Sequence, residues 1–162
     1  MMAISLLPVF EWMEATPVAQ AIRHSAKLIA LLESVHLIGL TLLLGTIVMV
    51  DLSVLGFGIG HSPASRIARE LRGWTAAGLV IMLISGPLLL SSEALRCYRT
   101  PAFWIKMALL AIALIFHFTL HGSAVSEEPP RERARWTAGL SLALWIGVAF
   151  AGKAIAIFQP PD

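Results

Sequence analysis

A carboxylate and an imidazole lie one helical turn apart in the stretch LLESVHLIGL, residues 31–40. Glu33 and His36 are three residues apart, so they would share one face of a helix and could contribute to a single site. The stretch FHFTLH places His117 and His121 four residues apart, again on one face. Neutral imidazole ligates haem iron and metal ions, and a carboxylate can carry protons, so both pairs could take part in cofactor chemistry.

The elements that must position these groups are membrane helices. Of the 162 residues, 57% are hydrophobic, and the mean hydropathy is +0.80. A bilayer core needs about 20 apolar residues per helix. The sequence predicts an all-α membrane protein, a four-transmembrane-helix bundle in a single integral membrane domain, with a short interfacial helix at about 4–14 before it. The predicted spans are about 28–50, 74–90, 104–120 and 138–157.

Charge and helix-start signals refine this prediction. The net charge of +2 is small and spread over the connectors, which argues against a nucleic-acid partner. Thr16-Pro17 and Thr100-Pro101 are typical helix starts, because threonine can cap amide groups and proline has no amide proton to leave unpaired. We expect the first membrane helix to begin near Thr16-Pro17.

Depth within the bilayer indicates which groups could meet. At about 1.5 Å per residue, Glu33 lies roughly 7 Å and His36 roughly 12 Å below the surface nearer the N-terminus. Lys153 lies about 6 Å from the same surface, so it could pair with Glu33. His117 lies roughly 20 Å deep, an offset of about 8 Å from His36 that helix tilt could partly absorb.

The leading hypothesis is a b-type haem held by two histidines. His36 and His117, on different helices of an apolar bundle, could ligate the iron from its two faces. Gly39 and Gly86 could give a flat macrocycle clearance against a helix. The haem would pass electrons to or from a quinone or a partner subunit.

The charged residues have places in this hypothesis. Lys153 or Lys106 would neutralise a haem propionate, and Glu33 would support the site or carry protons. A charge near the bilayer centre is costly, so such groups usually face a partner, a cofactor or water.

Other readings stay open. In one alternative the histidines only bond a neighbouring helix and the glycines serve ordinary helix packing, in an accessory subunit without a cofactor. His117 and His121 have the spacing of a two-histidine metal clamp, to which His61 could add a ligand, in a metal-handling or small-solute protein. Small residues also leave room for a homo-oligomer.

Several motifs carry a resemblance. The run ESVHLIGLTLLLGTIVMVDLSVLG, with ARELRGWT, TPAFWIKMALL, FHFTL and LWIGVAFAGK, resembles a small bacterial four-helix membrane family catalogued as a domain of unknown function. This resemblance implies a multi-pass protein of the bacterial inner membrane. More distantly, His36 followed nine residues later by Gly45 is similar to copper-resistance-type membrane proteins and to haem-containing membrane protoporphyrinogen oxidases. That similarity implies a haem-ligand role for His36, although Leu43 and Leu44 stand where those proteins carry an aromatic residue.

Overall fold

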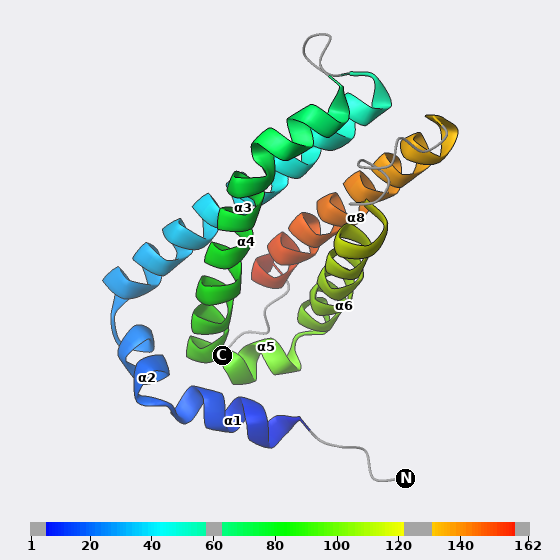
Figure 1. Ribbon diagram of the computed structural model, residues 1–162. Helices are drawn as coiled ribbons and strands as arrows, with labels where there is room; N and C mark the ends of the chain where they lie inside the picture. The colour runs from blue at the N-terminus through cyan, green and yellow to red at the C-terminus, as the bar shows by residue number, and fades with distance from the viewer. Residues whose placement is uncertain (1–5, 58–62, 122–130, 158–162) are drawn as a thin grey trace, which may run out of the picture.

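The structure is a computed structural model that describes residues 6–57, 63–121 and 131–157. Every regular element in these ranges is helical. Figure 1 shows long helices running side by side, with the short helices gathered at one end. The elements are α1 (Leu7–Ala15), α2 (Pro17–Arg23), α3 (Ala26–Leu55), α4 (Ala64–Ser92), α5 (Ala94–Arg99), α6 (Pro101–Phe116), a π-helical turn η1 (His117–His121) and α8 (Arg131–Ile157).

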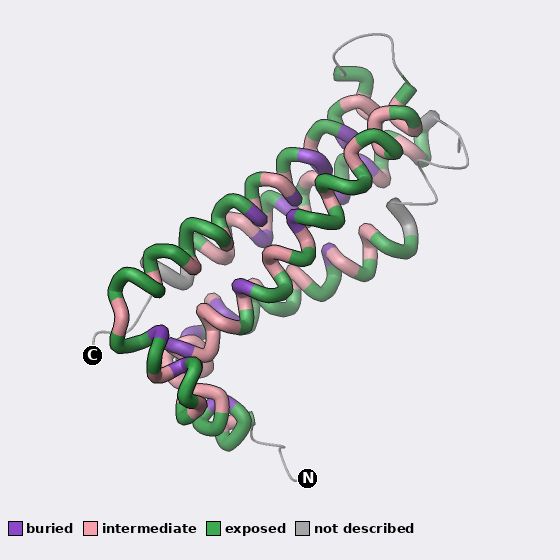
Figure 2. The backbone as a smooth tube through the Cα atoms, turned by 60° about the vertical axis from the view of Figure 1, so that its left-hand side comes forward, coloured by how far each residue is buried: buried purple, intermediate pink, exposed green. Residues whose placement is uncertain are grey.

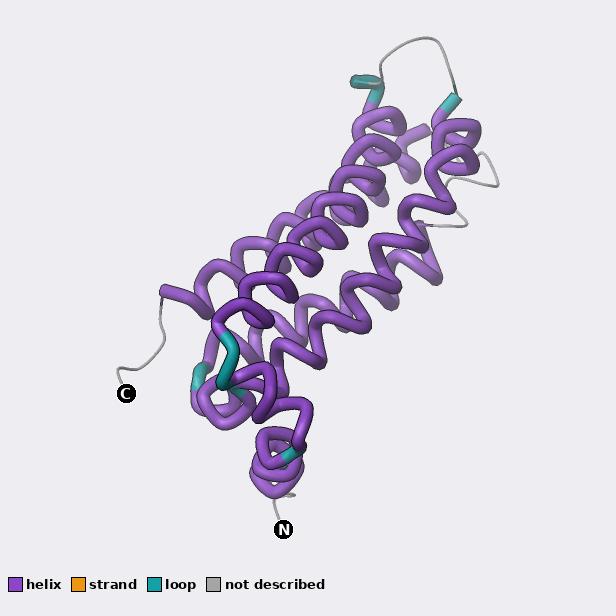
Figure 3. The backbone as a smooth tube through the Cα atoms, turned by 90° about the vertical axis from the view of Figure 1, so that its left-hand side faces the viewer, coloured by secondary structure: helices purple, strands orange, loops and turns teal. Residues whose placement is uncertain are grey.

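Four of the described helices are long and apolar enough to cross a bilayer, which confirms the predicted fold class. Each of these helices begins before its predicted apolar run, because the backbone is already helical where the side chains are still polar. Figure 3, a side-on view, shows that loops take up only short stretches of the described backbone. The candidate spans are Ala26–Leu55, Ala64–Ser92, Pro101–Thr119 and Glu132–Ala154.

The N-terminal segment forms two helices before the first span. Thr16 caps α2, accepting a hydrogen bond from the Ala19 amide at 3.3 Å. The expectation that the first membrane helix begins at Thr16-Pro17 is wrong, because α2 ends at Arg23. Ser25, in an extended conformation, caps a new helix and accepts from the Leu28 amide at 3.4 Å.

An aromatic cluster fixes α1 to the rest of the protein. Phe10 is buried, and its ring centroid lies 5.1 Å from that of Tyr98 and 6.0 Å from those of Phe103 and Trp104. The predicted N-terminal helix therefore packs against α5 and the start of α6. Its opposite face carries Trp12, which is 69% exposed. The structure thus has the short helix predicted before the first span.

Two glycines allow α3 and α4 to pack closely. A Cβ at Gly78 would lie 2.7 Å from the backbone nitrogen of Leu43 and 2.9 Å from the carbonyl oxygen of Gly39. A Cβ at Gly39 would lie 2.6 Å from Ile81 Cγ2. Small residues at a membrane helix crossing let backbones approach in this way. Gly39 is therefore occupied by helix packing and does not provide clearance for a macrocycle.

The main core joins α3, α6 and α8. Its buried members are Leu43, Ile47, Ala113, Trp145 and Val148. Figure 2 shows buried positions along the inner faces of the helices and exposed positions over most of the outside. The exposed outer positions include large apolar side chains, as expected of a surface that faces lipid.

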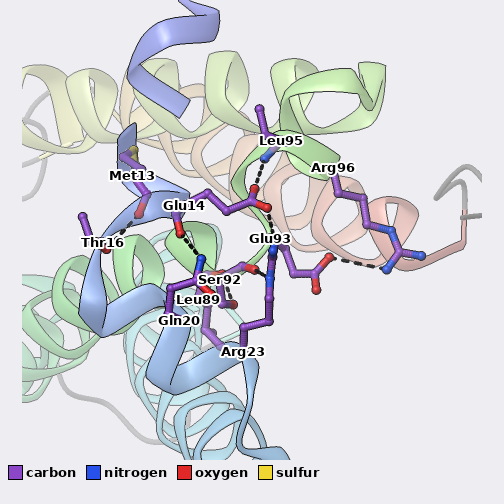
Figure 4. A network of polar contacts seen from close by, with 10 residues as sticks. All are labelled: Met13, Glu14, Thr16, Gln20, Arg23, Leu89, Ser92, Glu93, Leu95 and Arg96. Carbon is purple, nitrogen blue, oxygen red and sulfur yellow. Dashed lines mark hydrogen bonds and ion pairs between the residues drawn. The ribbon is translucent and has the colours of Figure 1, made fainter. Parts of the chain in front are cut away.

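The break between α4 and α5 is held by side chains from the N-terminal helices (Figure 4). The Glu14 carboxylate accepts a hydrogen bond from the Leu95 amide, in the first turn of α5, at 2.8 Å. Arg23 forms an ion pair with Glu14 and donates from Nε to the carbonyl of Ser92, the last residue of α4, at 2.9 Å. The Glu14 carboxylate pairs with a backbone amide at the positive N-terminal end of α5. The Arg23 guanidinium pairs with a backbone carbonyl at the negative C-terminal end of α4.

Candidate functional site

His36 forms a hydrogen bond across the α3–α4 interface. Its Nδ1 lies 2.8 Å from Ser85 Oγ, and the Ser85 side chain is almost fully buried. The Ser85 hydroxyl donates its single proton to the Ile81 carbonyl oxygen at 2.6 Å. Ser85 Oγ must therefore accept from His36, so Nδ1 carries the proton of the neutral ring. The lone pair of the imidazole is left on Nε2, the atom available to a ligand.

A glycine and a lysine complete the surroundings of His36. A Cβ at Gly86 would lie 3.6 Å from His36 Cε1, so the glycine gives room to the imidazole ring itself. The Lys106 ammonium, from α6, is close enough to interact electrostatically with His36. Its Nζ lies 3.8 Å from the Cβ that a side chain at Gly152 would have, which places it against α8. We call His36, Ser85, Gly86 and Lys106 the His36 site.

Glu33 and Lys153 do not join this site. Both side chains are exposed on the outside of the bundle. The ion pairs among the described residues link other groups, and none joins Glu33 to Lys153. Depth counting placed the two residues at one level, but it carried no information on how each helix is rotated.

His117 lies in a different layer. It begins the π-helical turn η1, is half-buried, and its ring contacts Trp145 edge-on with centroids 6.4 Å apart. His36 precedes the core residue Leu43 by seven positions, whereas His117 follows the core residue Ala113 by four. Because α3 and α6 run in the same direction, the two histidines are separated by more than about 10 Å along the bundle. The structure does not bring them together around one iron.

The metal clamp gains no support from the described residues. They contain no group of three histidine, cysteine or acidic side chains close enough to hold a metal ion. His61 and the side chain of His121 lie outside the described part of the chain.

Some polar residues of the interior were missed from the sequence. Ser85 gave no signal, since serine is common in membrane helices. Asp51 directly follows the predicted end of the first span at Val50, so the predicted apolar run does not include it. In the structure α3 continues to Leu55, and Asp51 and Ser141 are both fully buried. A carboxylate flanked on both sides by apolar residues, as in VMVDLSVLG, was the available signal.

Fold and site together define a multi-pass membrane protein with a half-buried histidine held between two spans. The chain belongs to the DUF6644 family, a family of unknown function, whose model matches residues 9–158. No curated protein and no solved structure matches the chain. The distant similarity to copper-resistance proteins and protoporphyrinogen oxidases therefore has no support beyond the motif.

Proposed function

We propose that the chain is a b-type haem-binding protein of the bacterial inner membrane, with His36 as an iron ligand. It would transfer electrons to or from a quinone or a partner subunit. The observation that carries this proposal is the hydrogen bond from His36 Nδ1 to Ser85. Histidines that ligate metals commonly donate their other ring proton to a neighbouring acceptor, which fixes the ring and its tautomer.

The His36 site would hold the haem iron through one histidine and not two. His36 offers Nε2, whereas His117 belongs to the layer of Trp145. The proposal therefore assigns a single protein ligand to the iron at this site. Lys106 suits a haem propionate better than Lys153 does, because Lys106 lies within electrostatic range of His36 and Lys153 is exposed.

The chain would tune the cofactor through its own groups. A bound haem supplies one-electron chemistry, with a potential set by its ligand, its burial and nearby charge. Ser85 would hold the His36 proton on Nδ1 and so keep the ligand lone pair on Nε2. Lys106 would place a positive charge beside the site, and the apolar helices would limit the access of water.

The test is a reduced-minus-oxidised absorbance spectrum of protein purified from haem-replete cells. We expect a b-type band in the wild type, its loss in His36→Ala and its retention in His117→Ala. Wild-type protein without the band, or a band that persists in His36→Ala, would refute the proposal. The second outcome would leave His36 with the packing role of an accessory subunit.

Ser85 is tested as a positioning residue by potentiometric titration. Ser85→Ala should keep the band and change the midpoint potential, and Ser85→Thr should restore the wild-type potential. Ser91→Ala is the matched control, because Ser91 also donates to a carbonyl of its own helix but does not contact a histidine. Equal potentials in all four proteins would remove Ser85 from the site.

A further inference from the structure

A second group of polar residues is buried where α3, α6 and α8 meet. Asp51 and Ser141 are fully buried, and Trp145 is 2% exposed. Ser141 and Trp145 are four residues apart, so they lie on one face of α8. The ring of His117, from η1, contacts Trp145. We call Asp51, Ser141 and Trp145 the Asp51 cluster; through Trp145 it adjoins the main core, on the side away from His36.

The Trp145 indole carries a donor that the described residues do not satisfy. Its Nε1 is buried and has no hydrogen-bond partner among them. An indole N–H can only donate. Burying such a donor without an acceptor costs free energy, because its hydrogen bond to water is lost and not replaced. In a membrane interior such a donor is expected to find an acceptor.

The Ser141 hydroxyl is directed away from its own helix backbone. Thr46, Ser85 and Thr137 each donate to the carbonyl oxygen four residues earlier, at 2.9, 2.6 and 2.9 Å. Ser141 forms no such bond with its helix. Its hydroxyl instead interacts with the Asp51 carboxyl group on α3. Two side chains one turn apart on α8 thus present polar groups to the protein interior and not to their own backbone.

We propose that the Asp51 cluster binds internal water, held by the Trp145 indole N–H, the Ser141 hydroxyl and the Asp51 carboxyl group. An internal water needs two to four polar partners. These three groups supply a donor in the Trp145 indole N–H, an acceptor in the Asp51 carboxyl group, and the Ser141 hydroxyl, which can donate or accept. The π-helical turn beginning at His117 borders the cluster, and such turns often occur at functional sites. The bound water links Asp51 on α3 to Ser141 and Trp145 on α8 by hydrogen bonds.

The test is water-edited solid-state NMR of the protein in lipid bilayers, with ¹⁵N-labelled tryptophan and alanine. Trp145→Phe assigns the Trp145 indole signal. We expect magnetisation to pass from water to the Trp145 indole signal at a rate within a few-fold of the rate for the indole of exposed Trp12. The amide of fully buried Ala113 is the dry reference. Transfer to Trp145 as slow as transfer to Ala113 would overturn the proposal.

Two variants test the other partners. Ser141→Ala should slow transfer to Trp145 several-fold, and Asp51→Asn offers a second, isosteric perturbation if Ser141→Ala inserts poorly. Ser85→Ala, in the His36 site, is the matched control and should leave the transfer unchanged. Wild-type rates in both Ser141→Ala and Asp51→Asn would show that the cluster does not hold the water. The result does not depend on haem, so this inference and the proposed function stand or fall separately.

Discussion

His36 Nδ1 lies 2.8 Å from Ser85 Oγ, and Ser85 gives its own proton to Ile81. Because the Ser85 proton goes to a backbone carbonyl of α4, the Ser85 oxygen accepts the hydrogen bond from His36. The proton of the neutral imidazole therefore lies on Nδ1. The arrangement matters with or without a cofactor, because it decides which ring nitrogen is basic.

The tautomer of His36 is the first prediction. In the cofactor-free protein, ¹⁵N NMR at neutral pH should show His36 protonated on Nδ1. Ser85→Ala removes the acceptor, so the ring should shift toward the Nε2–H form that free imidazole side chains prefer, at a stability cost of about 1 kcal/mol. Ser91→Ala should leave the His36 signals in place. A wild-type ring protonated on Nε2 would contradict the assignment.

The close approach of α3 and α4 predicts an intolerant glycine. In Gly78→Ala the new methyl group would meet the backbone of Leu43 and Gly39. We expect a loss of about 1–3 kcal/mol in the free energy of unfolding in mixed micelles, because backbone cannot move aside as a flexible side chain can. Gly45→Ala is the control, since nothing lies within 4 Å of a Cβ there. It should be neutral or stabilising, and equal losses in the two variants would argue against the close crossing.

The capping of α5 by Glu14 predicts a local effect. Glu14→Gln weakens both the ion pair with Arg23 and the bond to the Leu95 amide. We expect faster hydrogen exchange in the first turn of α5 and a loss of about 1–3 kcal/mol, the range for a buried charged hydrogen bond. Exposed Glu11 provides the control through Glu11→Gln. Indistinguishable exchange in the two variants would rule out the cap.

Cys97 should be a slow nucleophile. Burial, and then the nearby Glu93 carboxylate, raise the pKa of the Cys97 thiol above its ordinary value. Because the thiolate is the reactive form, maleimide labelling of the folded protein at neutral pH should be slower than that of an exposed cysteine, and should rise with pH. Cys97→Ser combined with Arg99→Cys moves the thiol to an exposed position of the same helix and is the reference.

The raised pKa of Cys97 also determines how the stability of the protein changes with pH. A folded pKa above the unfolded one means that the folded protein holds the thiol proton more tightly. The resulting stabilisation is complete below the unfolded pKa and is lost as pH rises through the folded pKa. Cys97→Ser should therefore show a smaller decline in stability in alkaline solution than the wild type does. A decline of the same size would indicate an ordinary thiol.

The sequence predicted the spans well because hydropathy depends only on the residues of one segment. It also gave His36 as the most informative polar residue. It did not predict the break between α2 and α3 at His24 and Ser25. The residues on both sides of Ser25 are compatible with one continuous helix, so nothing in the pattern indicated the extended Ser25. The pairing of Glu33 with Lys153 was expected from depth alone, and the rotation of each helix places both side chains outside.

Partners across an interface were harder to predict than the residues themselves. Ser85 faces His36 because Gly39 and Gly78 set the register of α3 on α4. The residue types alone do not show which way these two glycines face, because a glycine could equally have faced lipid or a cofactor. His117 was paired with His36 by residue type, but the core side chains between them place each in its own layer.

The caps supplied by Glu14 and Arg23 also constrain the order of assembly. Their partners, Leu95 and Ser92, follow 81 and 69 positions later in the chain. During synthesis the N-terminal helices emerge before both of these partners, so the two caps can form only after α4 and the first turn of α5 have been made. Closure of the N-terminal helices onto α5 therefore marks the point at which the first two spans and the turn after the second are all in place.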